Sequence, residues 1–106
     1  MPKNQDDVVQ EARALMATAF GTRFKGLVLY GSRALGDARP DSDLDLMVLL
    51  EGPIDLLKDL DATIRVLYPL QLHLDYAIHA SPTDVRDFQE QGFAVYRNAR
   101  REGILL

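Results

Sequence analysis

Two aspartates separated by one residue, Asp43 and Asp45, are the first residues of this sequence with an evident chemical use. They begin an apolar segment, residues 43–50, and alternate residues of a strand point to the same face. Two neighbouring carboxylates repel each other unless a cation compensates their charge. Hard divalent ions such as Mg²⁺ bind carboxylate oxygens and keep positions open for substrate phosphates. The pair therefore predicts a divalent-metal site, with a solvent-facing acidic turn as the ordinary alternative.

A glycine–serine turn, Gly31-Ser32, follows a short apolar segment, residues 27–30, and precedes the aspartates in the chain. Glycine lets backbone N–H groups approach a phosphate, and a serine hydroxyl adds a hydrogen bond. If the strands before and after the loop at 31–42 are antiparallel neighbours, the turn and the aspartates share one end of the sheet. We then expect bound phosphates to lie beside the metal.

A third acid, Asp75, lies in a segment that alternates between apolar and other side chains, residues 70–78. This alternation predicts a strand with Asp75 and His73 on its polar side. An aspartate on an edge strand facing solvent is the ordinary interpretation. The functional interpretation is a third carboxylate on the same sheet face as Asp43 and Asp45, an arrangement that is costly without a cation.

The elements that must position these residues follow from the spacing of apolar side chains. Helices are expected at 5–20, from Leu56 to a stop at Pro69, and from Ser81 onward, with strands at 27–30, 43–50 and 70–78. In the last helix, Ser81 is the expected N-cap and Pro82 the first helical residue.

The expected order is helix, strand, loop, strand, helix, strand, helix. Strands joined by a loop can be antiparallel, whereas strands joined through a helix are parallel. The sequence therefore predicts one α+β domain over residues 1–106, with a small mixed β-sheet flanked by helices.

Composition restricts the class of protein. An apolar fraction of 47% and a charged fraction of 26% are typical of an ordinary globular domain. No cysteine is present, which excludes disulfides and thiolate metal sites. The formal charge of −4 shows no basic surplus, so direct nucleic-acid binding is not expected. The polar N-terminus does not resemble a signal peptide, and no apolar run reaches the roughly 18 residues of a membrane span, so we expect a cytoplasmic protein.

The spacing of Gly31-Ser32, ten residues, Asp43, one residue and Asp45 resembles the signature of the DNA polymerase β-like nucleotidyltransferase superfamily. The resemblance is to its minimal nucleotidyltransferases and covers essentially the whole chain. It implies that Asp43 and Asp45 hold two Mg²⁺ ions that also bind a nucleoside triphosphate. It also implies that a third carboxylate, assigned to Asp75, ligates one metal and helps to deprotonate the attacking hydroxyl.

The same resemblance assigns the nucleotide site. Gly31 and Ser32 match residues that hold the β- and γ-phosphates of the triphosphate. Arg33 matches a position that is often basic and contacts phosphate or acceptor, with a surface arginine as an equal alternative. No role is expected for Tyr30 or His79.

The implied reaction is in-line attack of a hydroxyl on the α-phosphorus of ATP, with release of pyrophosphate. Short members of the family resemble the antitoxin of a toxin–antitoxin pair, whose partner is a helical HEPN-type ribonuclease. Such antitoxins transfer AMP to a tyrosine of the toxin (AMPylation). Two alternatives stay open: a non-catalytic antitoxin that neutralises its partner by contact, and a small-molecule nucleotidyltransferase completed by a separate helical subunit.

Overall fold

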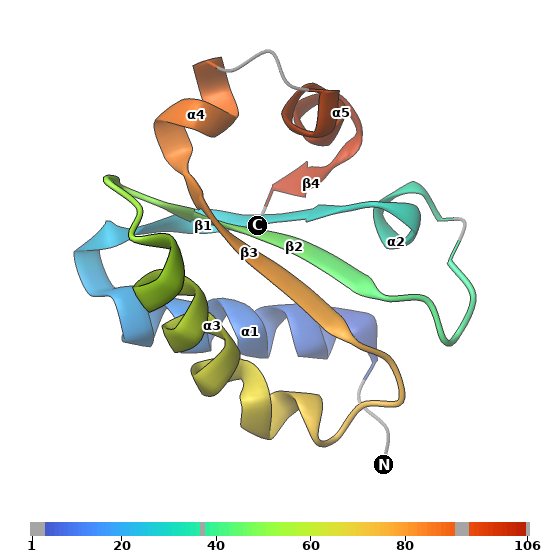
Figure 1. Cartoon of the computed structure of the whole chain (residues 1–106). Helices are drawn as coiled ribbons and strands as arrows, with labels where there is room; N and C mark the ends of the chain where they lie inside the picture. Colours follow the sequence, from blue (N-terminus) through green and yellow to red (C-terminus); the bar gives the residue numbers. More distant parts are fainter. Residues whose placement is uncertain (1–3, 37, 91–93, 106) are drawn as a thin grey trace.

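The computed structural model describes residues 4–36, 38–90 and 94–105 of the chain (Figure 1). Its elements are, in order, α1 (Gln5–Phe20), the 3-10 turn η1 (Gly21–Arg23), β1 (Phe24–Tyr30), α2 (Ser32–Leu35), β2 (Leu44–Leu50), α3 (Leu56–Gln71), β3 (Ile78–Asp84), α4 (Val85–Glu90), α5 (Ala94–Glu102) and β4 (Ile104–Leu105). Among these helices, none has the length and apolar character needed to cross a membrane.

The strands form one mixed sheet in the order β3-β2-β1-β4. β1 is antiparallel to β2 and to β4, whereas β2 and β3 are parallel. α1 and α3 cover one face of the sheet, and α4 and α5 lie on the other (Figure 1). The prediction of an α+β fold with a mixed sheet flanked by helices is confirmed.

The side chains of β2 alternate between the two faces of the sheet, and this alternation decides which of them can be functional. Leu44, Leu46, Val48 and Leu50 are buried against α1 and α3. Met47 and Leu49 point to the opposite face, where Phe88 of α4 and Ala99 of α5 cover them. Asp43 and Asp45 share that second face but lie at the start of the strand, where they remain exposed and half-buried, respectively.

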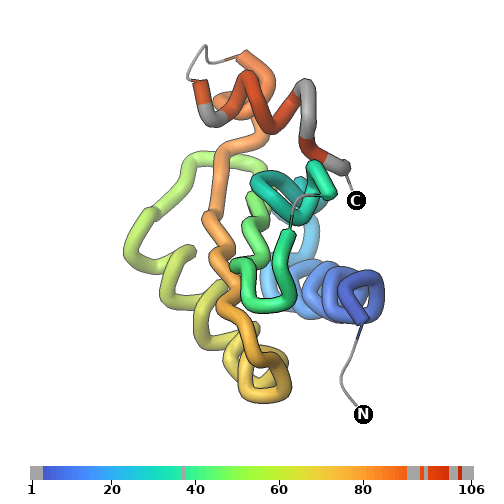
Figure 2. Tube along the Cα trace, turned by 90° about the vertical axis from the view of Figure 1, so that its right-hand side faces the viewer, coloured from blue at the N-terminus to red at the C-terminus, as the bar shows by residue number. Residues whose placement is uncertain are grey.

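The first half of the chain follows its sequence prediction closely. The helix expected at 5–20 is α1, and the amide of Asp7 donates to the Asn4 side chain at 2.8 Å as an N-cap. The segment at 31–42, which the sequence predicts to be a loop, begins with the short helix α2. In Figure 2, the loop that follows α2 (teal to green) lies beside the start of β3 (orange), and the amide of Leu44 donates to Ala77 at 2.8 Å.

The predicted strand over residues 70–78 is wrong. Leu70 and Gln71 complete α3, and the strand runs instead from Ile78 to Asp84. Thr63, Leu67 and Leu70 are buried at helical spacing, so their packing overrides the apparent two-residue alternation. Pro69 lies on the exposed side of α3 near its end, where the loss of one helical hydrogen bond is tolerated.

The predicted start of the last helix is also wrong. Ser81 and Pro82 belong to β3, an edge strand, where a proline without an N–H group is compatible with the sheet. The helix begins at Val85, and the segment predicted as one helix forms α4 and α5. Residues 91–93, between α4 and α5, lie outside the described residues. The short strand β4 was not predicted.

An ion pair anchors α3 to the far end of the sheet. Both terminal nitrogens of the Arg23 guanidinium donate to the Asp59 carboxylate at 3.0 Å, and Asp59 is 3% exposed. The Asp55 amide donates to the same carboxylate at 3.0 Å. The hydrogen bonds from Arg23 hold the pKa of Asp59 below its usual value, against the opposing effect of burial.

We expect Asp59→Ala to lower the free energy of unfolding by about 2–4 kcal/mol near neutral pH, because it leaves the Arg23 charge without its partner. Since the folded-state pKa lies below the unfolded value of about 3.9, this stabilisation is present above that value and is lost as the pH falls through the folded-state pKa. Urea unfolding at neutral and acidic pH measures both effects. The matched control is Asp61→Ala, which removes the exposed ion pair of Asp61 with Arg65 on the same helix and should cost about 0.5 kcal/mol or less. Equal losses in the two variants would contradict the prediction.

Candidate active site

The two aspartates lie at the start of β2, in the middle of the sheet. β2 begins at Leu44, so Asp43 directly precedes it. Asp45 is opposite Tyr30 of β1 and opposite His79 of β3. Residues directly opposite each other in neighbouring strands project to the same face, so three strands contribute side chains to one area.

The Gly31-Ser32 turn lies against the Asp45 carboxylate. Gly31 has φ 73° and ψ −160°, a backbone conformation that is essentially restricted to glycine. A Cβ atom at this position would overlap Oδ2 of Asp45, so the missing side chain allows the close approach. Ser32 is the first residue of α2. The structure thus brings Gly31, Ser32 and Asp45 together as the sequence predicts, while their roles stay predictions.

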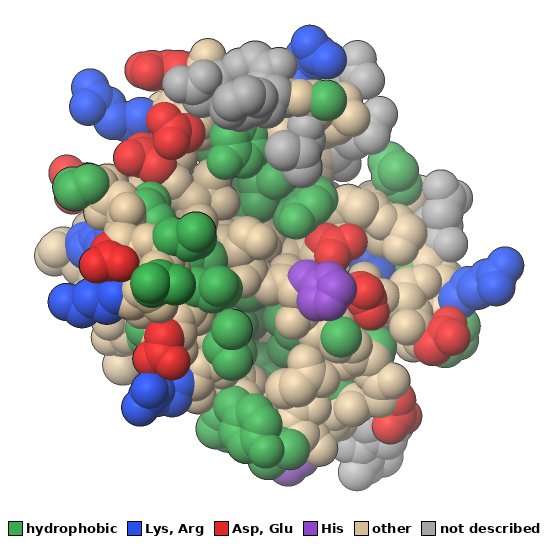
Figure 3. Space-filling model, in the orientation of Figure 1, with side chains coloured by type: hydrophobic (Ala, Val, Ile, Leu, Met, Phe, Trp, Pro, Cys, Tyr) green, Lys and Arg blue, Asp and Glu red, His purple; other side chains and the backbone are tan. Residues whose placement is uncertain are grey.

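His79 is a member of the site that the sequence reasoning missed. Its Nδ1 atom lies 3.6 Å from Oδ2 of Asp43 and 3.6 Å from Oδ1 of Asp45. Figure 3 shows a histidine side chain (purple) between acidic side chains (red) on this face. Only the register of β3 places His79 opposite Asp45. A strand over residues 70–78 does not predict this register.

The structure does not bring Asp75 to this site. Asp75 is exposed in the turn between α3 and β3, three residues before the first residue of that strand. The side-chain amide of Gln71 spans the turn, accepting from Ile78 N and donating to Tyr76 O, each at 2.7 Å. Within the part of the chain that the structure describes, no three His, Asp or Glu residues are already arranged to hold a metal. A catalytic role of Asp75 stays a prediction.

The Arg33 side chain is hydrogen-bonded to other groups of the protein and does not extend freely into solvent. Its guanidinium donates to the backbone carbonyls of Ser42 at 2.8 Å and Pro40 at 3.2 Å, and to the Gln5 side chain at 3.2 Å. It also lies 4.0 Å from the ring centroid of Tyr76. Arg33 therefore braces the loop that leads to Asp43 against α1 and the turn before β3. A contact with phosphate stays a prediction.

Burial and charge make the aspartate pair unfavourable on its own. Burial raises the pKa of Asp45, and the neighbouring Asp43 adds to this effect, while His79 opposes it. The pKa of Tyr30 is raised by burial first and by the charge of Asp45 second, with a hydrogen bond to Ser81 opposing. The ionised pair is thus a place where a bound cation would be stabilising.

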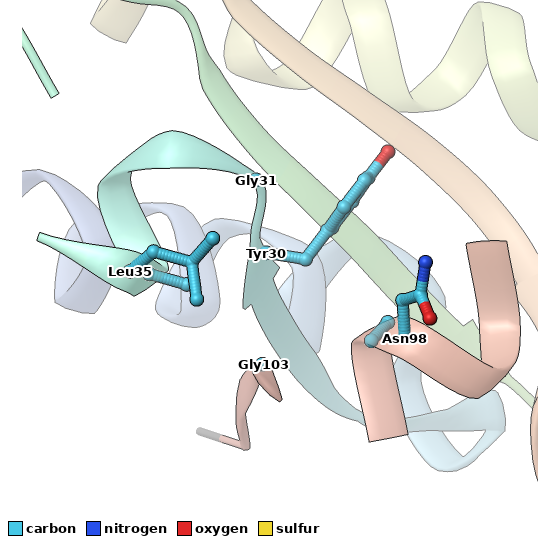
Figure 4. A pocket seen from close by; sticks show the side chains of 7 residues that line it. Tyr30, Gly31, Leu35, Asn98 and Gly103 are labelled. Atoms are coloured by element: carbon cyan, nitrogen blue, oxygen red, sulfur yellow. The ribbon is translucent and has the colours of Figure 1, made fainter. Parts of the chain in front are cut away.

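A pocket of about 220 Å³ adjoins the turn on the side of α5 (Figure 4). Its wall is formed by residues of β1, the turn before α2, α2, α5 and the residue after α5: Tyr30, Gly31, Ala34, Leu35, Asn98, Ala99 and Gly103. Figure 4 shows the Tyr30 ring directed away from β1 toward the neighbouring strands. Gly31 therefore borders the Asp45 carboxylate on one side and an open pocket on the other.

Comparison with known proteins identifies the family. The family model described as nucleotidyltransferase domain matches residues 13–104. A Methanocaldococcus jannaschii protein, named as a candidate protein adenylyltransferase, is 26% identical over 104 residues that cover 97% of this chain and 98% of that protein. A crystal structure described as a toxin–antitoxin with AMP-PNP has a similar fold, with a TM-score of 0.60 and 13% identity over 96% of this chain and 72% of that chain. Since the family model spans most of the chain and all of the site residues described above, the chain belongs to the nucleotidyltransferase domain family and is a nucleotidyltransferase.

Proposed function

We propose that this nucleotidyltransferase transfers AMP from ATP to a hydroxyl of a partner protein, a tyrosine of a helical HEPN-type toxin, and so acts as an antitoxin. The observation that carries the proposal is the contact of the Gly31 turn with Asp45, beside Asp43. A protein acceptor is supported by the similarity to a relative named as a candidate protein adenylyltransferase. A toxin as partner is supported by the fold shared with a toxin–antitoxin structure.

The donor set fits divalent cations. Asp43 and Asp45 offer carboxylate oxygens on one face, and burial of Asp45 beside a like charge favours a cation there. We propose that these residues hold two Mg²⁺ ions together with the triphosphate. When bound, such ions neutralise the charge that develops on the phosphates.

The chain's own residues then bind and orient the nucleotide. The backbone N–H groups at Gly31 and Ser32 and the Ser32 hydroxyl hold the β- and γ-phosphates. The pocket beside Gly31 leaves room for the nucleoside. This orientation aligns the α-phosphorus with the acceptor oxygen, so the new P–O bond forms as the bond to pyrophosphate breaks and the hydroxyl proton passes to a base. Asp75 for the base and Arg33 for a phosphate contact are the residues that the family resemblance proposes.

The test is a transfer assay with the protein encoded by the adjacent gene. The chain is incubated with this protein, Mg²⁺ and ATP labelled at the α-phosphate, and in parallel with ATP labelled at the γ-phosphate. We expect label on a tyrosine of the partner from α-labelled ATP alone, because AMP and not phosphate is transferred. Asp43→Asn should lower this labelling by about 1,000-fold or more, since it removes a metal-binding oxygen.

The matched control is Asp41→Asn, which changes an exposed aspartate of the same loop and should leave labelling within about twofold. Absence of label with the wild-type chain, or equal label with Asp43→Asn, contradicts the proposal. Neutralisation of the partner by an Asp43→Asn, Asp45→Asn double variant would show instead that contact alone is sufficient.

A further inference from the structure

The outer side of α3, with Leu72 at its end, carries a set of well-exposed large apolar side chains. Leu57 is 83% exposed, and Leu56, Ile64, Tyr68 and Leu72 are 58–65% exposed. A helix that packs on a sheet ordinarily turns polar side chains outward, and a contiguous exposed apolar patch marks an interaction site. In Figure 3, apolar side chains (green) follow α3 across the lower left of this face, with acidic and basic side chains (red and blue) beside them. We call six exposed residues of this side the outer row: Leu57, Asp61, Ile64, Arg65, Tyr68 and Leu72.

A shallow groove lies beside the outer row, between α3 and β3. It has a volume of about 80 Å³ and is lined by Thr63, Ile64, Leu67, Tyr68, Gln71, Ile78 and Ala80. β3 is an edge strand, so no further strand of the described sheet covers it. Two helices pack by fitting the side chains of one into the grooves of the other. The outer row and the groove together therefore form a surface onto which another helix fits.

The outer row is symmetric about a point midway between positions 64 and 65. Leu57 and Leu72 lie equally far from this point in opposite directions along the helix, and so do Asp61 and Tyr68. From Leu57 to Leu72 the row is about 22 Å long, at the roughly 1.5 Å rise per residue of an α-helix. In a dimer with a two-fold axis, residue i of one copy contacts residue j of the other, and j contacts i. The outer row therefore fits an identical row that runs in the opposite direction.

We propose that the outer row is the interface of a homodimer, in which α3 packs antiparallel to α3 of a second copy of this chain. Leu57 of each copy then contacts Leu72 of the other, and the two Ile64 side chains meet beside the axis. These contacts remove the exposed apolar surface from water, which supplies most of the affinity. This inference does not depend on the proposed transfer reaction.

The charges of the outer row are complementary in the same arrangement. Asp61 and Arg65 form an ion pair at 2.9 Å, with both side chains mostly exposed. At the axis the two ion pairs come together, so each guanidinium lies between two carboxylates. The Tyr68 hydroxyl lies opposite Asp61 of the second copy and can donate to its carboxylate. Since exposed ion pairs contribute little to binding, these polar contacts fix the register of the two helices rather than the affinity.

The position of the outer row favours a second copy over the acceptor of the transfer reaction. α1 and α3 cover one face of the sheet, whereas Asp43 and Asp45 lie on the face of α4 and α5 (Figure 1). A protein hydroxyl that reaches the aspartates therefore approaches from the side opposite α3. A partner bound there leaves the outer row exposed, and a dimer through α3 leaves the aspartates open.

Sedimentation equilibrium of the full chain over a range of concentrations tests the dimer. We expect the wild-type chain to change reversibly from one copy to two as the concentration rises. Ile64→Glu places two like charges beside the axis and should raise the dissociation constant by about 100-fold or more. The matched control is Leu35→Glu, which puts the same charge on an exposed leucine of α2 and should leave the dissociation constant within about threefold. Because both positions are exposed, circular dichroism should show both variants folded.

Cysteine cross-linking tests the register of the two helices. The chain has no cysteine of its own, and a disulfide requires Cα atoms within about 7 Å of each other. In a mixture of Leu57→Cys and Leu72→Cys proteins, cross-linked dimers should form about tenfold faster or more than in either variant alone, because the dimer brings these two positions together.

A monomer at all concentrations, a dimer that Ile64→Glu does not weaken, or equal cross-linking in the mixture and in Leu57→Cys alone would overturn the inference. If the wild-type chain is monomeric and Ile64→Glu abolishes binding of the protein encoded by the adjacent gene, the outer row belongs to that partner, and the inference is likewise wrong. The sedimentation and cross-linking measurements need neither ATP nor Mg²⁺. Absence of transfer activity therefore rejects the proposed function alone.

Discussion

Gly31→Ala is expected to lower nucleotidyl transfer by about 100-fold or more while the protein still folds. The added Cβ would overlap Oδ2 of Asp45, so the carboxylate must leave the position in which it faces the Gly31-Ser32 turn. The backbone conformation at φ 73° adds a strain of about 1–3 kcal/mol. Steady-state transfer kinetics and thermal unfolding measure the two effects separately.

Gly36→Ala is the matched control for the strain. Gly36 closes α2 at φ 79°, so alanine there carries a similar left-handed backbone cost, of about 1–2 kcal/mol. Among the described residues, no atom other than those of the adjacent residues of the chain lies within 4 Å of the position that its Cβ would take. We expect this variant to lose stability but to keep its activity within about threefold. If both variants lost activity equally, backbone strain in the turn, and not displacement of Asp45, would be the cause.

Asp45→Asn is expected to lower transfer by about 1,000-fold or more, because the amide cannot supply the negative charge that holds a divalent cation. Binding of metal and nucleotide to the folded state alone raises the apparent stability of the wild-type protein. We therefore expect Mg²⁺ and ATP to raise the melting temperature of the wild-type chain, and to have little effect on the variant. Thermal unfolding with and without these ligands is the measurement.

Without ligands, the same variant should be as stable as the wild-type protein or more so. Burial raises the pKa of Asp45, so the charged carboxylate lowers stability at any pH above its unfolded-state value, including neutral pH. Removing this charge removes that loss of stability, which is common at functional sites. The exposed control Asp41→Asn should respond to ligands as the wild-type chain does. An Asp45→Asn protein that is less stable than wild type, or that responds fully to Mg²⁺ and ATP, would show that Asp45 has a structural role.

Local patterns in the sequence were sufficient for the first half of the chain. The apolar spacing of α1, the alternation along β2 and the glycine turn before α2 each depend on contacts close in sequence, or on one buried face. The loop between β1 and β2 allowed an antiparallel pairing, and the structure has that pairing. These features were enough to place Asp43, Asp45, Gly31 and Ser32 at one end of the sheet.

The second half depended on tertiary packing. Residues 70–78 carry a two-residue alternation that is compatible with a strand, yet Leu67 and Leu70 are buried by helical packing in the core formed by α1, α3 and the sheet. This packing extends α3 through Pro69 and moves the strand to Ile78–Asp84. A strand that starts at Ile78 leaves Asp75 in a turn and places another residue opposite Asp45.

The sequence by itself determined the family, the aspartate pair and the Gly31-Ser32 turn, because their identity depends on residue types at fixed short spacings. Only the tertiary structure decided which side chain of β3 lies opposite Asp45. A parallel strand that enters through a helix can pair in several registers, and each shift by one residue exchanges the faces of the sheet. The register found here pairs His79 with Asp45, and it follows a helix α3 that continues to Gln71, so that β3 can begin only after it.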